Sequence, residues 1–336
     1  MKESVMPGME KIASATATAS SILPKESMLA VKTRNKKLFI GIPKERSAQE
    51  NRIGLTPEAV KQLTDHGHTI WIEAGAGEPS RHSDTDFSEA GARIVYTAKE
   101  VYEADILLKI APPSYDMIEY LRPGQTLISA LQFGSLTADY VAALCKKKIN
   151  AVSFELIRDK SGSKPVVRAM SEIAGSTVML IAAEYLSYST EGKGIILGGI
   201  TGVPPSKVVI LGAGTVAEYA ARAALGLGAE VKVFDNHIYK LRRLKHNVGV
   251  QLFTSTLDSS VLHHEITQAD VVVGALIPDD NSAPCMIPET VVAQMNPGSV
   301  IIDVSIDQGG CFETSQMTTL NDPIYRKYDI IHYCVP

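Results

Sequence analysis

The 336-residue chain lacks the features that mark several large classes of protein. Its four cysteines, at positions 145, 285, 311 and 334, show no C-x-x-C or similar spacing, so we expect reduced thiols and no metal site. No apolar run approaches the ~20 residues that cross a bilayer, and no positively charged start leads into an apolar core. These absences predict a cytoplasmic protein without a membrane segment or a secretory signal.

The chain also lacks an excess of positive charge. Its formal net charge is −4 and no strong basic patch is present, which argues against nucleic acid as a partner. Hydrophobic residues make up 45% and charged residues 21% of the sequence, as is usual for globular proteins. The length exceeds that of one average domain and suits two.

Three regions differ in pattern. Residues 1–37 contain a small polar stretch (ATATASS) and a basic run (KTRNKK), which predict a flexible N-terminal tail. From KLFIGI at 37–42 onward, short apolar strands alternate with amphipathic helices, the pattern of parallel βαβ units. A long helix is expected from Ser171 to about Tyr188, and a second series of strands starts after Lys207. The expected strands are KLFIGI, HTIWIEA, DILLKI, QTLISAL and NAVSFE, then VVIL, EVKVF, DVVVGAL and SVIIDVSI.

The sequence therefore predicts an α/β protein with two Rossmann-like, doubly wound parallel-sheet domains joined by a long helix. Residues 38–170 are assigned to a substrate (catalytic) domain, and residues 171–336 to a nucleotide-binding domain.

The stretch VVILGAGTVAEYAARAALGLGAEVKVFDN, at 208–236, predicts a dinucleotide site. Gly212 supplies the tight turn after the strand, Gly214 lets a pyrophosphate approach the helix N-terminus, and Ala217 permits close helix–sheet packing. Asp235 ends the next strand, 23 residues after Gly212, where it can accept both ribose hydroxyls and repel a 2′-phosphate. This pattern favours NAD over NADP; a plain tight corner between a strand and a helix is the alternative.

Three further residues are candidates for contacting a substrate. Asp307 lies just past a strand, in VIIDVSIDQGGCFETS, where an open parallel sheet binds its ligands; a turn-forming aspartate is the alternative. Lys109 ends the apolar strand DILLKI, where an isolated buried charge is costly, unless the side chain extends back to solvent. Arg52, in QENRIGLTP, has the planar geometry to hold a carboxylate, with a surface salt bridge as the default.

Together these motifs resemble the alanine dehydrogenase family, of which the NAD-binding subunit of proton-translocating transhydrogenase is a close relative. The resemblance runs from about residue 38 to the end. It rests on GIPKE…ENRIGLTP, EAGAG, ADILLKIAPP, MSEIAGS, GGITGVPPSKVVILGAGTVAEYAARAALGLGAEVKVFD and GSVIIDVSIDQGGCFETS…HYCV. The last of these looks more like alanine dehydrogenase than transhydrogenase.

The resemblance implies reversible, NAD-linked oxidative deamination of L-alanine to pyruvate and ammonia by a homo-oligomer, with a hexamer as the family's form. It implies that Arg52 holds the substrate carboxylate, that Lys109 contacts the substrate, and that Asp307 sits beside nicotinamide and substrate. It also assigns cofactor contacts, to Ser171, Asp235, Lys240 and Leu276.

Two departures from the family pattern affect these expectations. Gln132, in ALQFGSL, stands where the family's catalytic histidine is expected, and glutamine cannot exchange a proton near neutral pH. Relatives continue past HYCVP with a segment that returns to the first domain, so this return is expected to be missing. Two alternatives stay open: a transhydrogenase-like NAD(H)-binding component and a non-catalytic NAD-binding protein. A saccharopine-type dehydrogenase shares the architecture and ranks below them.

Overall fold

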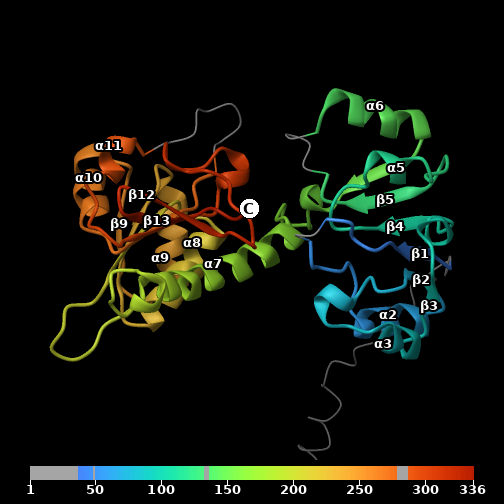
Figure 1. Ribbon diagram of the computed structural model, residues 1–336, viewed down its shortest axis with the longest axis horizontal. Coiled ribbons are helices and arrows are strands. Elements are labelled where there is room, and N and C mark those ends of the chain that lie inside the picture. Colours follow the sequence, from blue (N-terminus) through green and yellow to red (C-terminus); the bar gives the residue numbers. More distant parts are fainter. Residues whose placement is uncertain (1–36, 48–49, 132–135, 278–286) are drawn as a thin grey trace, which may run out of the picture. The chain divides into compact units, whose positions relative to one another are not determined.

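The computed structural model describes residues 37–47, 50–131, 136–277 and 287–336, which form two α/β domains, each built on its own sheet (Figure 1). Three sequence-based expectations fall outside the described residues: the tail at 1–36, Gln132 and Cys285. Of the cysteines that the structure does describe, Cys145 is exposed, and Cys311 and Cys334 are buried.

The first sheet has six strands in the order β3-β2-β1-β4-β5-β6, and every pair is parallel. Its strands are β1 (Phe39–Ile42), β2 (Thr69–Glu73), β3 (Arg93–Val95), β4 (Ile106–Leu108), β5 (Thr126–Ser129) and β6 (Asn150–Ser153). Its helices are α2 (Pro57–Asp65), α3 (Asp84–Glu89), α4 (Ala98–Val101), α5 (Tyr115–Ile118) and α6 (Ala138–Lys147). The chain starts in the centre, winds outward to β3, and returns across β1 to build the other half.

The second sheet has seven strands in the order β12-β13-β11-β10-β7-β8-β9. Its strands are β7 (Lys207–Leu211), β8 (Glu230–Phe234), β9 (Phe253–Ser255), β10 (Val271–Gly274), β11 (Val300–Asp303), β12 (Ile324–Lys327) and β13 (Ile330–Tyr333). Its helices are α7 (Pro165–Leu186), α8 (Thr215–Gly226), α9 (Ile238–Val248), α10 (Ser259–Thr267) and α11 (Glu289–Val292). The strand order from β9 to β13 follows the doubly wound arrangement that binds dinucleotides.

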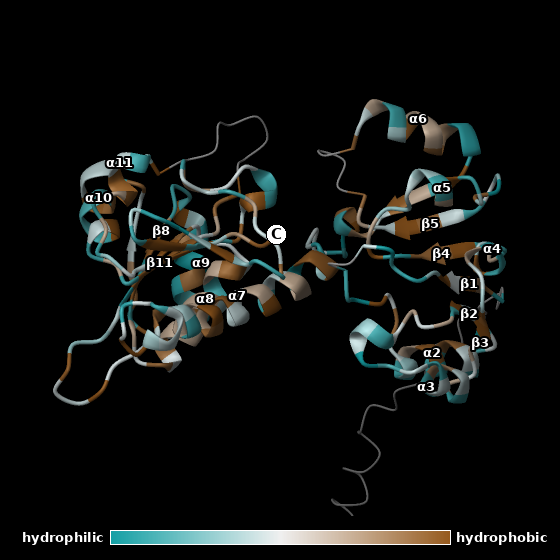
Figure 2. Cartoon of the chain, in the orientation of Figure 1, coloured by the Kyte–Doolittle hydropathy of each residue, from teal (hydrophilic) through white to brown (hydrophobic). Residues whose placement is uncertain are grey.

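Burial on both faces explains the continuous apolar strands of the second sheet. In β7, Val208 and Ile210 pack in the cluster that includes α7, α8 and α9, whereas Val209 and Leu211 pack in the cluster that includes α10 and α11. Figure 2 shows the hydrophobic colouring concentrated along the strands, with hydrophilic residues on the outer helices. A parallel sheet covered on both sides reads in this way, which is why the sequence indicated the fold class correctly.

The long helix α7 begins at Pro165, six residues before the start expected at Ser171. A proline fits the first turn of a helix, where its missing N–H has no intrahelical partner, so it marks the start here. Gly175 lets α7 approach α8 closely, because a Cβ at this position would collide with the Val216 carbonyl. By length and composition alone α7 could cross a membrane, a test that core helices also pass.

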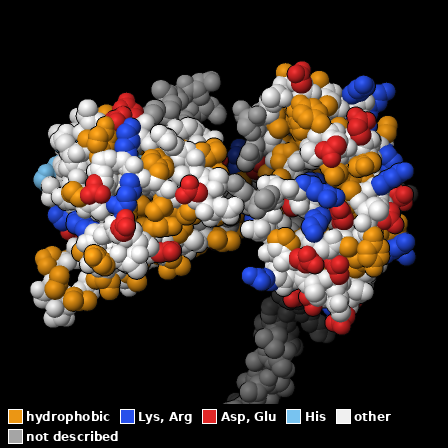
Figure 3. Space-filling model, viewed as in Figure 1, with side chains coloured by type: hydrophobic (Ala, Val, Ile, Leu, Met, Phe, Trp, Pro, Cys, Tyr) orange, Lys and Arg blue, Asp and Glu red, His pale blue; other side chains and the backbone are white. Residues whose placement is uncertain are grey.

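Much of the apolar surface of α7 remains exposed. Ile173 and Leu180 are 68% and 67% exposed, and the connection after the helix also exposes large apolar side chains. Hydrophobic side chains reach the surface over α7 and this connection in Figure 3. Exposed apolar area of this extent is typical of surfaces that contact another protein chain.

The sequence missed four short strands: β3, β9, β12 and β13. The last two form an antiparallel hairpin, so the second sheet is parallel with one antiparallel edge strand. The hairpin turns at Tyr328 and Asp329, both at positive φ, without the glycine that would have indicated a turn. The predicted two-sheet α/β class is confirmed, with this correction.

Candidate functional site

Four adjacent strands of the second sheet end at one edge, and they bring most of the predicted cofactor residues together. The order β11-β10-β7-β8 places Asp307, Leu276, the Gly212 turn and Asp235 after successive strands. The carboxyl ends of parallel strands are where open α/β sheets bind their ligands.

The turn after β7 has the geometry that a dinucleotide pyrophosphate requires. Gly212 adopts a φ of +108°, and a Cβ there would collide with the Ala275 carbonyl after β10. Gly214 precedes α8, and a Cβ at this position would meet nothing within 4 Å, so the space above the helix N-terminus is open. No side chain caps this end of α8, which leaves its backbone N–H groups available to an anion. Ala217 is fully buried against the sheet, as expected.

Asp235 is buried, 3% exposed, and its carboxylate already accepts three hydrogen bonds. One oxygen accepts the Ala213 N–H at 2.8 Å; the other accepts the His237 N–H at 2.8 Å and lies 2.9 Å from His237 Nδ1. The expectation that Asp235 accepts both ribose hydroxyls stays a prediction, and a ligand would share this carboxylate with Ala213 and His237.

The positions of Lys240 and Ser171 do not by themselves indicate a cofactor contact. Lys240 lies in the first turn of α9, half-buried, with its N–H donated to the His237 carbonyl. Ser171 lies near the N-terminal end of α7 and is half-buried. Their cofactor roles stay predictions from the family resemblance.

Asp303 organises the loop that carries Asp307. Its buried carboxylate accepts N–H groups from Ser305 at 3.1 Å and Cys311 at 2.7 Å, and the Ser315 hydroxyl at 2.6 Å. Burial raises the pKa of Asp303, and these hydrogen bonds partly oppose the shift. Asp303 therefore holds the loop together through hydrogen bonds within the protein.

Asp307 lies in the short helical turn Ile306–Gln308, directly after β11. It is exposed, yet the protein atoms around its carboxyl raise its pKa by desolvation, and the nearby Asp303 carboxylate adds to the increase. A carboxylate that is accessible and more basic than usual is suited to accepting a proton from a ligand.

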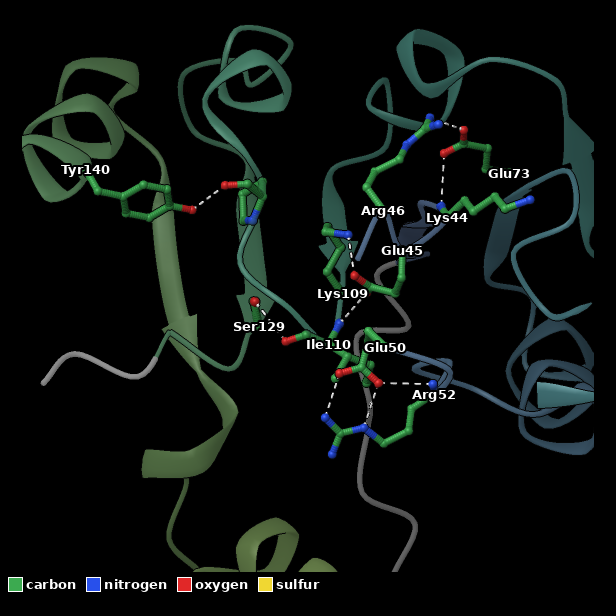
Figure 4. A network of polar contacts seen from close by, with 11 residues as sticks. Lys44, Glu45, Arg46, Glu50, Arg52, Glu73, Lys109, Ile110, Ser129 and Tyr140 are labelled. Carbon is green, nitrogen blue, oxygen red and sulfur yellow. Dashed lines mark hydrogen bonds and ion pairs between the residues drawn. The ribbon is translucent and has the colours of Figure 1, made fainter. Parts of the chain in front are cut away.

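In the first domain, Lys109 does not extend to solvent, so that alternative is wrong. The side chain is 4% exposed and its Nζ lies 2.8 Å from Glu45 Oε2 (Figure 4). Glu45 follows β1 and Lys109 follows β4, and these strands are neighbours in the sheet. The two charges therefore meet at the carboxyl edge because of the strand order.

Arg52 lies next to this pair and is held by Glu50. Its Nε and Nη2 donate to the two Glu50 carboxylate oxygens at 2.7 and 2.6 Å (Figure 4). Nη1 lies 3.9 Å from Met170 Sδ. Burial raises the pKa of Glu50, but hydrogen bonds and the charges of Arg52 and Lys109 outweigh it and leave this pKa below its usual value. Hydrogen bonding to Glu50 in turn raises the pKa of Arg52.

Three residues of these sites were not found by the sequence reasoning: Glu45, Glu50 and His237. Glu45 and Glu50 stand in the motifs GIPKE and ENR, and Glu45 also follows a strand, which is the signal that could have indicated it. Gln132 lies outside the described residues, so its relation to Lys109 stays a prediction. Within the described ranges, no group of three or more His, Cys, Asp or Glu side chains could hold a metal ion.

Comparison with known proteins identifies this pair of domains. Residues 41–174 match the N-terminal domain of the alanine dehydrogenase/PNT family, and residues 178–336 match its C-terminal domain. The chain belongs to the alanine dehydrogenase/PNT family. Alanine dehydrogenase of Mycolicibacterium smegmatis is 40% identical over 299 residues, which cover 89% of this chain and 80% of that protein.

Solved structures of the alanine dehydrogenase/PNT type have the same fold. An L-alanine dehydrogenase superposes with a TM-score of 0.83 at 35% identity, covering 88% of this chain and 82% of the other. A transhydrogenase from Sinorhizobium meliloti superposes with a TM-score of 0.77 at 24% identity, covering 88% and 86% of the two chains. The second likeness concerns the fold alone.

Proposed function

We propose that this chain catalyses the reversible, NAD-dependent oxidative deamination of L-alanine to pyruvate and ammonia. Relatives named alanine dehydrogenase, 37–40% identical over most of the chain, support this activity. The observation that carries the proposal is the pair of ion pairs in the first domain, the exposed Arg52–Glu50 and the buried Lys109–Glu45, because a module that only binds a cofactor needs no such group in its other domain.

The residues at the edge of the second sheet fit a nicotinamide dinucleotide. The open space at Gly214 and the uncapped start of α8 suit the pyrophosphate, and Asp235 offers a carboxylate for the ribose hydroxyls. Its negative charge disfavours a 2′-phosphate, which supports NAD over NADP. The cofactor, when bound, accepts the hydride from the substrate.

In the proposed reaction, Arg52 and Lys109 bind the substrate. Arg52 uses Nε and Nη2 on Glu50, so the Nη1 edge is the part of the guanidinium available to an alanine carboxylate without displacing Glu50. Lys109 presents an ammonium group, which can donate to a substrate oxygen and stabilise negative charge there.

Asp307 is proposed to accept a proton from the substrate ammonium or from the water that attacks the imine. Its raised pKa makes the carboxylate a better proton acceptor than an ordinary aspartate. The hydrogen bonds that Asp303 accepts from Ser305 and Cys311 restrain the loop that carries the Asp307 carboxylate.

The direct test is the formation of NADH, followed by its absorbance, when L-alanine and NAD are added to the purified protein at alkaline pH. We expect alanine-dependent NADH formation, and its loss in Lys109→Met. A protein that binds NADH normally but shows no turnover would instead act as a cofactor-binding component.

We also propose that the chain forms a homo-oligomer. The exposed apolar side chains of α7, among them Ile173 and Leu180, support this because such area is costly to leave in water. Size-exclusion chromatography with light scattering measures the molecular mass of the assembly directly. Ile173→Glu combined with Leu180→Glu should shift the mass towards the monomer.

A further inference from the structure

The ion pair between Glu45 and Lys109 is buried and doubly anchored. The side chains are 9% and 4% exposed, and Nζ donates to Glu45 Oε2 at 2.8 Å. The other carboxylate oxygen, Oε1, accepts the Ile110 N–H at 2.7 Å (Figure 4). Glu45 therefore accepts hydrogen bonds from both the side chain of Lys109 and the backbone of Ile110.

Stability does not account well for this pair. Burying two charges costs several kcal/mol per ion, and apolar residues of similar volume often stabilise a fold equally well or better. A buried ion pair at the ligand-binding edge of a sheet instead suits a group that must be charged and precisely oriented.

The surrounding charges balance. Lys109 and Arg52 face the carboxylates of Glu45 and Glu50, and the charges of Lys109 and Arg52 contribute to the lowered pKa of Glu50. Each cation thus has its own carboxylate, and the incoming substrate carboxylate is the additional negative charge. Removing Glu45 would leave Lys109 next to Glu50 and Arg52 without its nearest counter-charge.

We propose that Glu45 is a positioning residue for catalysis: it keeps Lys109 an oriented ammonium donor rather than a proton acceptor. An ammonium group has three N–H donors. Within the described part of the chain, Glu45 is the acceptor recorded for Nζ, which leaves two donors for a substrate oxygen. This inference rests on the proposed alanine dehydrogenase function and names a residue that the family assignment of substrate contacts did not include.

The test compares Glu45→Gln with the matched variant Glu73→Gln in the full chain. Glu73 is also a buried carboxylate at the end of a strand, 8% exposed, and it binds the Lys44 N–H and Arg46 instead of Lys109. Rates of alanine oxidation are measured from pH 7 to 11, together with thermal unfolding and NADH affinity.

We expect Glu45→Gln to lower kcat for L-alanine about tenfold or more, with a smaller change in KM, because Lys109 loses the carboxylate that orients its ammonium group. NADH affinity stays unchanged, since the cofactor residues lie on the second sheet. Glu73→Gln lowers the unfolding temperature but leaves kcat close to the wild-type value.

Glu45→Asp separates charge from position. It keeps the negative charge but shortens the side chain, so we expect a kcat below that of the wild type and above that of Glu45→Gln. A wild-type kcat in Glu45→Gln, with Lys109→Met inactive, overturns the role of Glu45 while leaving the proposed function intact. If the wild type itself lacks alanine-dependent turnover, the proposed function fails instead.

If Glu45→Gln does not fold, Glu45→Asp decides the question, because it keeps a negative charge next to Lys109. A wild-type kcat in Glu45→Asp would then overturn the proposal.

Discussion

The carboxylate of Asp303 accepts the backbone N–H of Cys311 at 2.7 Å and so closes the loop in which Asp307 stands. Gly310 completes this closure at a φ of +77°, where a Cβ would lie 2.9 Å from Asp303 Oδ2. A buried aspartate thus uses its hydrogen-bonding capacity to place an exposed one. The two carboxylates are four residues apart in the sequence. Asp303 is buried and binds the loop, whereas Asp307 is exposed and accessible to a ligand.

Asp307→Asn should separate turnover from cofactor binding. The amide cannot accept a proton, so we expect turnover with L-alanine to fall by ~10²-fold or more, the usual scale for a positioned acid–base group. NADH affinity and thermal stability should change little, since the side chain is exposed. The acid limb of the wild-type rate profile should lie above the ordinary aspartate range, because the Asp307 pKa is raised, and should be absent from the variant.

The control for this prediction is Asp303→Asn. Asp303→Asn weakens the hydrogen bonds from the Cys311 N–H and the Ser315 hydroxyl, so it should lower the unfolding temperature. Asp307→Asn should leave the unfolding temperature nearly unchanged. Normal turnover in Asp307→Asn would remove this residue from the mechanism.

Asp235 should set the preference for NADH over NADPH. Its carboxylate charge opposes a 2′-phosphate, so the protein should bind NADH more tightly in a fluorescence titration. Asp235→Asn keeps the shape but removes the charge, so it should narrow the gap between the two cofactors. Asp235→Ala also loses the Ala213 and His237 hydrogen bonds and should weaken both cofactors. Equal or tighter binding of NADPH by the unchanged protein would contradict the prediction.

Gln132 should determine whether the pH–rate profile has a limb from a catalytic histidine. A catalytic histidine gives a limb near pH ~6.5, whereas glutamine does not titrate there. We expect the wild-type profile to lack this limb. Gln132→His should introduce it and raise turnover with alanine. Absence of alanine-dependent NADH formation with either residue at 132 would favour the cofactor-binding alternative.

His332 should make the stability of the second domain sensitive to acid. The ring is fully buried, stacks on Tyr325 and lies 2.9 Å from the Thr314 hydroxyl, with Nδ1 3.0 Å from the Ile330 carbonyl. Burial, with a contribution from the positive charge of Lys327, lowers the His332 pKa to about 4. The unfolded chain takes up this proton near pH ~6.5, so lowering the pH below that value favours unfolding until the folded ring is also protonated.

The shift corresponds to a loss of on the order of 3 kcal/mol of unfolding free energy between pH ~6.5 and ~4. Urea titrations at several pH values measure it. His332→Phe should retain the stacking and reduce the pH slope, whereas the exposed His246→Gln should not. An equal slope in all three proteins would show that His332 does not carry the effect.

The sequence by itself determined the features that depend on local backbone chemistry. Gly212 and Gly214 in their strand–turn–helix context indicated the cofactor turn, because a tight turn and an open helix N-terminus make demands on neighbouring residues. Continuous apolar strands likewise indicated two covered parallel sheets. The sequence does not indicate the start of α7, which lies at Pro165 and not at Ser171, or the turn of the β12–β13 hairpin, where no glycine marks Tyr328 and Asp329.

The tertiary structure decided which charges meet. Glu45 and Lys109 lie 64 positions apart, and they pair because β1 and β4 are neighbours in the sheet. In the sequence Lys109 has no evident partner, but in the fold it forms a buried ion pair with Glu45. The fold also brings the His237 ring to the Asp235 carboxylate. Electrostatic partners depend on strand order and on burial, and both are set by long-range packing that no local pattern encodes.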